Sequence, residues 1–168
     1  ELVVVLVRSC QMLSKAKIGA LFAIERDQTL NPWVDRGTIL DAEVSSEIIN
    51  SIFYPGTALH DGAVVIQKGR IAAAGCLLPL SENEQLGSWA GTRHRAAVGL
   101  TEESDAVTIV VSEETGSVSI CVRGEVFRDL DREELAERLR SYYTKTDEPE
   151  KTGPLQSLLG LDGKGSDS

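Results

Sequence analysis

Residues 63–78, AVVIQKGRIAAAGCLL, hold two short apolar runs on either side of Lys68-Gly69. Ala63 to Gln67 and Ile71 to Leu78 have the length and apolar content of buried strands, and a Lys-Gly connection between them is typical of a β-hairpin. A hairpin joins antiparallel strands, whereas parallel strands need a long crossover connection. The stretch therefore argues against a purely parallel, doubly wound sheet and predicts a mixed one.

The remaining elements are arranged around this hairpin. Further strands are expected at 18–24, 37–44, 106–111 and 118–122, with Asn31-Pro32 as a turn and Arg123-Gly124-Glu125 as a second hairpin turn. Helices are expected at 2–17, at 45–53, from Thr92 to about 100, and at 131–143. The fold class that follows is α/β: a single domain with a mixed, mostly central β-sheet of about six or seven strands, flanked by helices.

Two polar stretches fall outside these elements. Residues 81–91 are polar and contain glycine, which predicts a loop. From 144 to 168 the sequence is rich in Lys, Asp, Pro, Gly and Ser, which predicts a flexible C-terminal tail after a folded domain at 1–143.

The overall composition limits the classes of partner. A chain of 168 residues is long enough for one domain with a hydrophobic core, and its net charge is −9. This charge argues against nonspecific DNA or RNA binding, which needs a broad basic surface, but it leaves room for a small anion at one cationic spot. The scattered cysteines, Cys10, Cys76 and Cys121, indicate reduced core thiols in a cytosolic setting, without a zinc cluster.

Three short polar segments are expected at the ends of strands or helices, where α/β folds place ligands: 59–63, 91–95 and 112–116. In the first, Asp61-Gly62 alone is a common turn pair. The preceding residues do not alternate as a strand, so no hairpin requires that turn. His60 beside Asp61 then offers a metal ligand next to a general base.

In the second segment, Arg93-His94-Arg95 follows Thr92, which is expected to cap a helix. The free amides and the positive dipole end of a helix start favour a phosphate, and guanidinium groups add paired donors. Residues two positions apart point roughly 200° apart around a helix, so both arginines cannot hold the same phosphate. One is expected to bind the ligand while the other braces the loop or reaches a partner subunit. The alternative is a solvated basic patch.

In the third segment, Glu113-Glu114 follows an apolar strand and could supply oxygen ligands to Mg²⁺ or Mn²⁺. The alternative is an ordinary acidic turn. The chain contains no phosphate-binding GxxxxGK[ST] loop, no GxGxxG dinucleotide motif and no HExxH.

Four segments in a fixed order carry a resemblance to a known family: LHDGAVVI (59–66), AAAGCLLPLS (72–81), GTRHRAAVGL (91–100) and TIVVSEETGSVS (108–119). From about residue 18 to 130 the chain resembles the diadenylate cyclases, nucleotidyltransferases that join two ATP molecules into cyclic di-AMP and release two pyrophosphates. Asp-Gly-Ala followed by Arg-His-Arg is specific to that family, whereas either tripeptide alone is not.

The resemblance implies a role for each segment. Asp61 would orient or deprotonate the ribose 3′-hydroxyl for in-line attack on the α-phosphorus of the other ATP. The catalytic set would be Asp61, Arg93, His94 and Arg95, with the triplet beside the phosphates. ATP would be bound by Gly62, Ala63, Leu77, Leu78, Thr92, Arg93, Ser112 and Glu113, with the two leucines near the adenine. A divalent metal, Mn²⁺ or Mg²⁺, would be held by His60, Glu113 and Glu114.

The two-fold symmetry of cyclic di-AMP implies a face-to-face homodimer, because each 3′-hydroxyl must face the other nucleotide's α-phosphate. The chain begins at Glu1 with an apolar helix whose first run is too short to span a bilayer. It is similar to membrane-anchored members, whose cyclase lies on the cytoplasmic face of the cell membrane, and we expect it to be part of such a protein. The alternative function is a nucleotide-sensing module with a cyclase-like fold and no turnover.

Overall fold

The computed structural model describes residues 1–147. The chain divides into two compact units, Glu1–Ala136 and Glu137–Ser168. The first unit contains the whole β-sheet, four helices and the start of a fifth, and the described part of the second unit is the remainder of that fifth helix. Of the predicted tail, residues 144–147 belong to this helix, and 148–168 lie outside the described residues.

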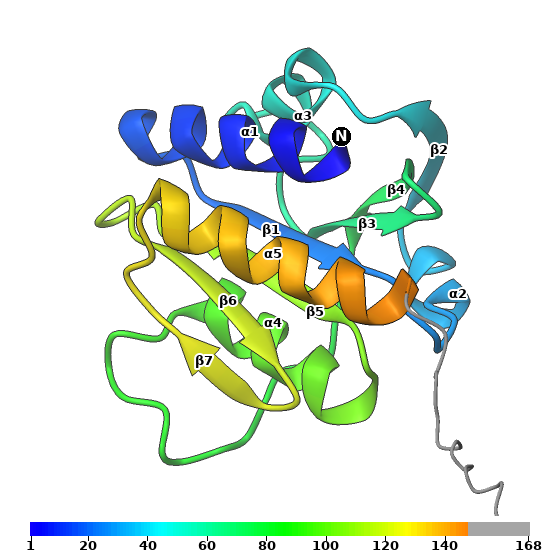
Figure 1. The fold of residues 1–168 in the computed structure, drawn as a ribbon. Helices are drawn as coiled ribbons and strands as arrows, with labels where there is room; N and C mark the ends of the chain where they lie inside the picture. The colour runs from blue at the N-terminus through cyan, green and yellow to red at the C-terminus, as the bar shows by residue number, and fades with distance from the viewer. Residues whose placement is uncertain (148–168) are drawn as a thin grey trace, which may run out of the picture. The chain divides into compact units, whose positions relative to one another are not determined.

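One mixed sheet of seven strands forms the centre of the first unit (Figure 1). Its strand order is β2-β4-β3-β1-β5-β6-β7. The pair β1–β3 is parallel and all other neighbouring pairs are antiparallel, which confirms the predicted mixed α/β fold. The strands are β1 (Ala20–Ile24), β2 (Thr38–Glu43), β3 (Ala63–Gln67), β4 (Arg70–Cys76), β5 (Val107–Val111), β6 (Val118–Val122) and β7 (Glu125–Phe127).

Both predicted hairpins are present, and the backbone explains them. The β3–β4 turn has positive φ at Lys68 (50°) and Gly69 (75°), and the β6–β7 turn has positive φ at Arg123 (51°) and Gly124 (81°). Two successive positive φ angles are characteristic of the tight hairpin turn whose twist matches that of the flanking strands. Strand β4 ends at Cys76, two residues earlier than predicted, so Leu77 and Leu78 follow the strand.

The helices are α1 (Leu2–Ala16), α2 (Asn31–Val34), α3 (Ser46–Phe53), α4 (Thr92–Glu103) and α5 (Arg132–Asp147). The turn predicted at Asn31-Pro32 is wrong, since these residues begin α2, where proline fits the first helical turn because the amide it lacks would have no partner there. Gly91, not Thr92, is the N-cap of α4. Helix α3 starts as predicted, with the Ser45 hydroxyl accepting a hydrogen bond from the Ile48 amide.

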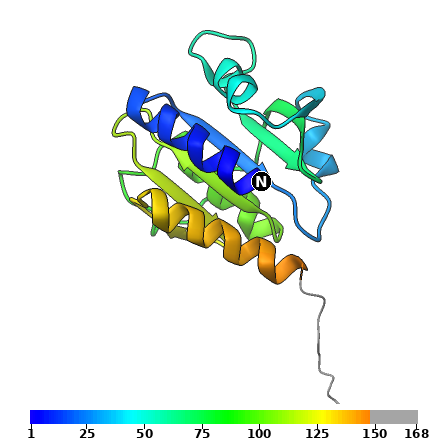
Figure 2. The same cartoon turned by 45° about the horizontal axis from the view of Figure 1, so that its top comes forward.

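Helices cover both faces of the sheet in the first unit. Every residue of β1 and β5 is buried. Helices α1 and α3 pack together on one face, where the Phe22 ring meets Phe53 at 5.2 Å between centroids. Helix α4 covers the other face, against β1, β5 and β6, and Figure 2 shows α1 and α4 on opposite sides of the strands. Leu21 and Ala23 on β1 share a core cluster there with Ala97 and Leu100 of α4.

The three cysteines are free and buried in the core, as predicted. Burial raises the pKa of Cys10 to about 12 and the pKa values of Cys76 and Cys121 to about 11. They therefore remain neutral thiols at neutral pH and are poor nucleophiles. In the described part of the chain, no helix has both the length and the apolar content needed to cross a membrane.

Candidate active site

The three polar segments converge on one pocket of about 490 Å³. The β-sheet register explains this convergence. Val111, at the end of β5, pairs with Ala20, at the start of β1, while β3 runs parallel to β1. The residues before β3 and those after β5 therefore lie at the same end of the central strands, and α4 begins beside them. The lining residues are His60, Asp61, Ser88, Trp89, Gly91, Thr92, Arg93, His94, Val110, Val111, Ser112, Glu113 and Glu114.

Arg93 is held against the start of β1. Its guanidinium lies over Gly19, where a Cβ would overlap it, and its Nη1 is 3.6 Å from a Glu113 carboxylate oxygen. The Arg93 Nε is buried and has no hydrogen-bond partner among the described residues. The Glu113 side chain is 65 % exposed, so this ion pair neutralises the Arg93 charge only weakly. The guanidinium is therefore positioned to bind an additional anion in the pocket.

His94 lies in the first turn of α4 and is buried. The Gly91 amide donates a long hydrogen bond of 3.4 Å to its Nδ1. Because an amide can only donate, Nδ1 carries no proton, and the neutral ring keeps its proton on Nε2. Burial, followed by the positive charges of Arg128 and Arg93, lowers the pKa of His94. The ring is therefore a neutral Nε2–H donor at neutral pH.

His60 and Asp61 lie just before β3. The His60 Nδ1 is 2.8 Å from the Thr57 carbonyl oxygen, which can only accept, so Nδ1 carries the proton and the Nε2 lone pair is available to a metal. Asp61 is exposed and lines the pocket. Gly62 has φ of 108°, and a Cβ there would meet Gly75 C at 2.7 Å. Gly62 thus fixes the backbone beside Asp61.

The turn after β5 is ordered by Ser112. Its hydroxyl accepts from the amides of Glu114 (3.2 Å) and Thr115 (3.3 Å). The Ser14 hydroxyl of α1 donates to the Gly116 carbonyl at the far side of the same turn. These contacts hold Glu113 and Glu114, both exposed, at the pocket.

Three side chains of the pocket are possible ligands for a metal ion. Within residues 1–147 no group of three or more His, Cys, Asp or Glu side chains could hold a metal ion. His60, Glu113 and Glu114 nevertheless line one pocket and supply one imidazole and two carboxylates. By themselves these described residues do not form a metal site, so a divalent ion there would also need oxygen ligands from a bound nucleotide, as Mg²⁺ commonly takes from substrate phosphates.

The two arginines point to different places, as their spacing predicted. Arg95 does not line the pocket. Its Nη1 donates to the Ser81 and Asn83 carbonyls and its Nη2 to the Leu86 carbonyl, each at 3.4 Å. Arg93 is thus the arginine that faces the pocket, whereas Arg95 braces the 81–91 loop. This geometry does not support direct contact between Arg95 and a substrate.

Four other predicted nucleotide-binding residues lie outside the pocket lining. Leu78 belongs to the hydrophobic core and Leu77 is 66 % exposed, so the structure does not bring them together beside the other site residues. Ala63 is fully buried in the core as the first residue of β3. Gly62 acts through its backbone conformation, as described above.

Among the residues at or beside the pocket that sequence reasoning did not select are Gly19, Ser88, Trp89 and Arg128. The Trp89 ring meets the His94 ring at 5.3 Å between centroids, and the Arg128 guanidinium lies 3.9 Å over the Trp89 ring. Trp89 could have been found from the sequence, because it is a large aromatic residue in a mostly polar loop at 81–91. Gly19 and Arg128 had no such signal, because only pairing between distant segments brings them to the site.

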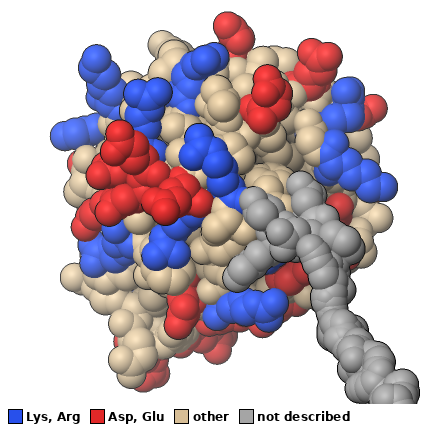
Figure 3. All heavy atoms as spheres, in the orientation of Figure 1, with Lys and Arg blue, Asp and Glu red and all other residues tan. Residues whose placement is uncertain are grey.

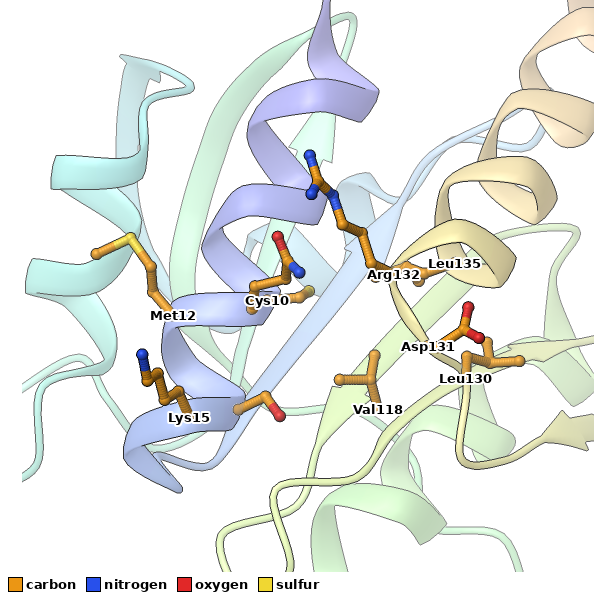
Figure 4. Close-up of a pocket in the computed structure, with 10 residues that line it drawn as sticks. Cys10, Met12, Lys15, Val118, Leu130, Asp131, Arg132 and Leu135 are labelled. Atoms are coloured by element: carbon orange, nitrogen blue, oxygen red, sulfur yellow. The ribbon is translucent and has the colours of Figure 1, made fainter.

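A second pocket of about 490 Å³ lies between α1 and the first residues of α5 (Figure 4). The labelled side chains combine apolar groups with Lys15, Asp131 and Arg132, and none of them belongs to the predicted site. On the face shown in Figure 3, acidic and basic side chains are interspersed.

Comparison with known proteins identifies the family to which this chain belongs. Residues 7–126 match the family model for the DisA bacterial checkpoint controller nucleotide-binding domain. The chain belongs to this family. It is 47 % identical over 138 residues to the cyclic di-AMP synthase CdaA of Bacillus subtilis, which covers 82 % of this chain and 50 % of that protein. It is 48 % identical over 128 residues to a diadenylate cyclase of Listeria monocytogenes, covering 76 % and 47 %.

A solved structure shares the fold. A double mutant of DacA from Staphylococcus aureus is 40 % identical and aligns with a TM-score of 0.83, covering 84 % of this chain and 95 % of that one. The family membership confirms the resemblance drawn from the four sequence segments. This chain spans about half the length of the curated relatives it matches.

Proposed function

We propose that this chain is a diadenylate cyclase, a nucleotidyltransferase that condenses two ATP molecules into cyclic di-AMP and two pyrophosphates. The observation that carries the proposal is the convergence of His60-Asp61, Thr92-Arg93-His94 and Ser112-Glu113-Glu114 on one pocket. An exposed carboxylate, a partly unsatisfied guanidinium, a neutral imidazole donor and two further carboxylates are suited to phosphoryl transfer, in which catalysis is mostly positioning and charge stabilisation.

The phosphates of ATP lie against the start of α4. There the helix dipole and the free first-turn amides favour an anion, and the Arg93 guanidinium adds fixed donors. The neutral His94 ring donates from Nε2 without introducing a further charge. These groups stabilise the negative charge that moves onto the departing pyrophosphate.

Asp61 accepts the proton of the ribose 3′-hydroxyl. The 3′-oxygen of one ATP then attacks the α-phosphorus of the other, and the bond from that phosphorus to the oxygen bridging the α- and β-phosphates breaks, releasing pyrophosphate. Repeating the step with the two nucleotides exchanged closes the ring of cyclic di-AMP. A positioned general base of this kind contributes about 10²–10⁴-fold in rate.

His60, Glu113 and Glu114 would hold a divalent ion, Mn²⁺ or Mg²⁺, once a nucleotide is bound. When bound, the ion neutralises phosphate charge and orients the triphosphate. The role of Ser112 is to keep the two glutamates in place through its turn hydrogen bonds.

The active species is a face-to-face homodimer, because each chain supplies one pocket while the product needs two opposed nucleotides. We place the chain within a longer membrane-anchored protein, with the cyclase on the cytoplasmic face, as the sequence resemblance implies. Nucleic acid is not a partner in this proposal.

The direct test is incubation of the purified chain with ATP and either Mn²⁺ or Mg²⁺, with cyclic di-AMP and pyrophosphate quantified by chromatography. Specific activity should rise with protein concentration until the dimer saturates. Binding of ATP without product at any concentration or with either metal would favour the alternative, a nucleotide sensor with a cyclase-like fold.

A further inference from the structure

Trp89 lines the pocket and contacts both a guanidinium group and an imidazole ring. On one side the Arg128 guanidinium lies 3.9 Å over the indole, and on another the imidazole of His94 meets it nearly perpendicularly, at 80°. Gly87 lies against the indole as well, since a Cβ at Gly87 would come within 2.9 Å of Trp89 Cδ1. The indole is thus held by Arg128 after β7, by His94 of α4 and by a glycine of its own loop.

The loop that carries Trp89 is itself tied down. Arg95 donates to three of its carbonyls, and the Ser81 amide donates to the Arg95 carbonyl at 2.9 Å. The Ser81 hydroxyl donates to the Glu102 carboxylate at 2.9 Å. All of these hydrogen bonds join the loop to α4, the same helix that carries His94. The loop and His94 therefore share one rigid support.

The His94 tautomer depends on a weak local contact. The hydrogen bond from the Gly91 amide to Nδ1 is 3.4 Å long, which is at the weak end of the range for such bonds. A bond of that length does not by itself hold an imidazole in one orientation. The Trp89 ring packed against the imidazole supplies the missing restraint, because an edge-to-face aromatic pair has a preferred geometry.

We propose that Trp89, anchored by Arg128, is a positioning residue that keeps the His94 ring oriented with its Nε2–H as the donor to the nucleotide. The proposal rests on the proposed function of this pocket as the nucleotide site. Arg128 directly follows β7, so the site depends on a cation–π contact between segments distant in sequence.

The central experiment measures the His94 tautomer directly. Long-range ¹H–¹⁵N correlation NMR of the imidazole should show a protonated Nε2 and an unprotonated Nδ1 in the wild type. Trp89→Leu should convert this signal into an averaged or mixed pattern, and Trp89→Phe should restore part of it because an aromatic ring remains. This readout needs neither ATP nor product, so it stands even if the chain proves not to be a cyclase.

The kinetic experiment separates positioning from binding. In Trp89→Leu we expect kcat for cyclic di-AMP formation to fall about tenfold or more, while KM for ATP changes by less than about threefold, since a misoriented donor affects the transition state most. Arg128→Met should give a smaller loss of the same kind. The double variant should lose less than the sum of the two single variants, because the cation–π contact couples Arg128 to Trp89.

Arg36→Met is the matched control. Arg36 lies 4.5 Å over the Trp33 ring in the same type of contact, and neither residue lines the pocket. It should leave the His94 signal and both kinetic constants unchanged. An unaltered His94 tautomer and unaltered kcat in a folded Trp89→Leu variant would overturn the proposal. So would a rise in KM with kcat unchanged, because that pattern would assign Trp89 a direct contact with ATP.

Discussion

Gly19 lies directly against the guanidinium of Arg93, and any side chain at position 19 would overlap it. The two residues are brought together because β1 begins beside the end of β5 and the start of α4. The space available to the pocket's principal cation is therefore set by a glycine that carries no chemistry itself.

We expect Gly19→Ala to displace Arg93 from its position and to weaken ATP binding by about tenfold, with little change in folding. A methyl group cannot share the space that the guanidinium occupies, whereas the backbone of Gly19 has no positive φ that would penalise alanine. Calorimetric titration with ATP measures the loss. In an Arg93→Ala background the same substitution should have almost no further effect, and independent, additive losses would contradict this explanation.

Asp61→Asn should lower the rate of cyclic di-AMP formation by about a hundredfold or more while ATP affinity changes little. Asparagine keeps the size and the turn propensity but cannot take the 3′-hydroxyl proton, and Arg93 still holds the phosphates. The measurement pairs calorimetry with product formation. Asp41→Asn is the control, since Asp41 is an exposed residue in an ion pair with Arg70 away from the pocket. Near-normal turnover in Asp61→Asn would show that Asp61 serves only as a turn residue and not as the general base.

Arg95→Ala should act through the loop. Losing the donors to the Ser81, Asn83 and Leu86 carbonyls should lower the free energy of unfolding by about 1–3 kcal/mol. Amide hydrogen exchange across 81–91 should accelerate, and ATP affinity should fall less than in Arg93→Ala. Arg70→Ala, which breaks an exposed ion pair, should cost less than about 1 kcal/mol. An unchanged exchange rate in the loop would show that Arg95 does not brace it.

The lowered pKa of His94 predicts how stability depends on pH. Its ordinary value is 6.5, and burial together with Arg128 and Arg93 places the folded value below this. Between the folded and unfolded pKa values the unfolded chain binds the extra proton, so stability rises with pH there. The contribution of a neutral His94 should be complete above about pH 6.5 and lost as the pH falls.

Urea unfolding of the wild type and His94→Gln across about pH 5 to 8 tests this dependence. Glutamine keeps a side-chain donor but does not titrate in this range. The wild type should lose stability relative to the variant on acidification. Parallel curves for the two proteins would mean that His94 titrates alike in the folded and unfolded states.

Local sequence was sufficient for the features that depend on neighbouring residues. Lys68-Gly69 and Arg123-Gly124 predicted the hairpins, because tight turns demand positive φ at adjacent positions. The same reasoning failed at Asn31-Pro32, where a proline suited to a turn is equally suited to the first turn of a helix. The four ordered segments were enough to predict the family, and the helix period was enough to predict that Arg93 and Arg95 diverge.

Which arginine faces the pocket was decided only by tertiary structure, as were the burial of Leu78 in the core, the glycine behind Arg93 and the indole beside His94. Each of these depends on two segments far apart in the chain that meet through strand pairing, and no residue's own type or spacing reveals its partner. The sequence by itself determined which chemical groups this protein has and the order in which they occur. The β1–β5 and β1–β3 pairings, by placing the end of β5 and the start of β3 at the same end of the sheet, determined which of those groups share a site.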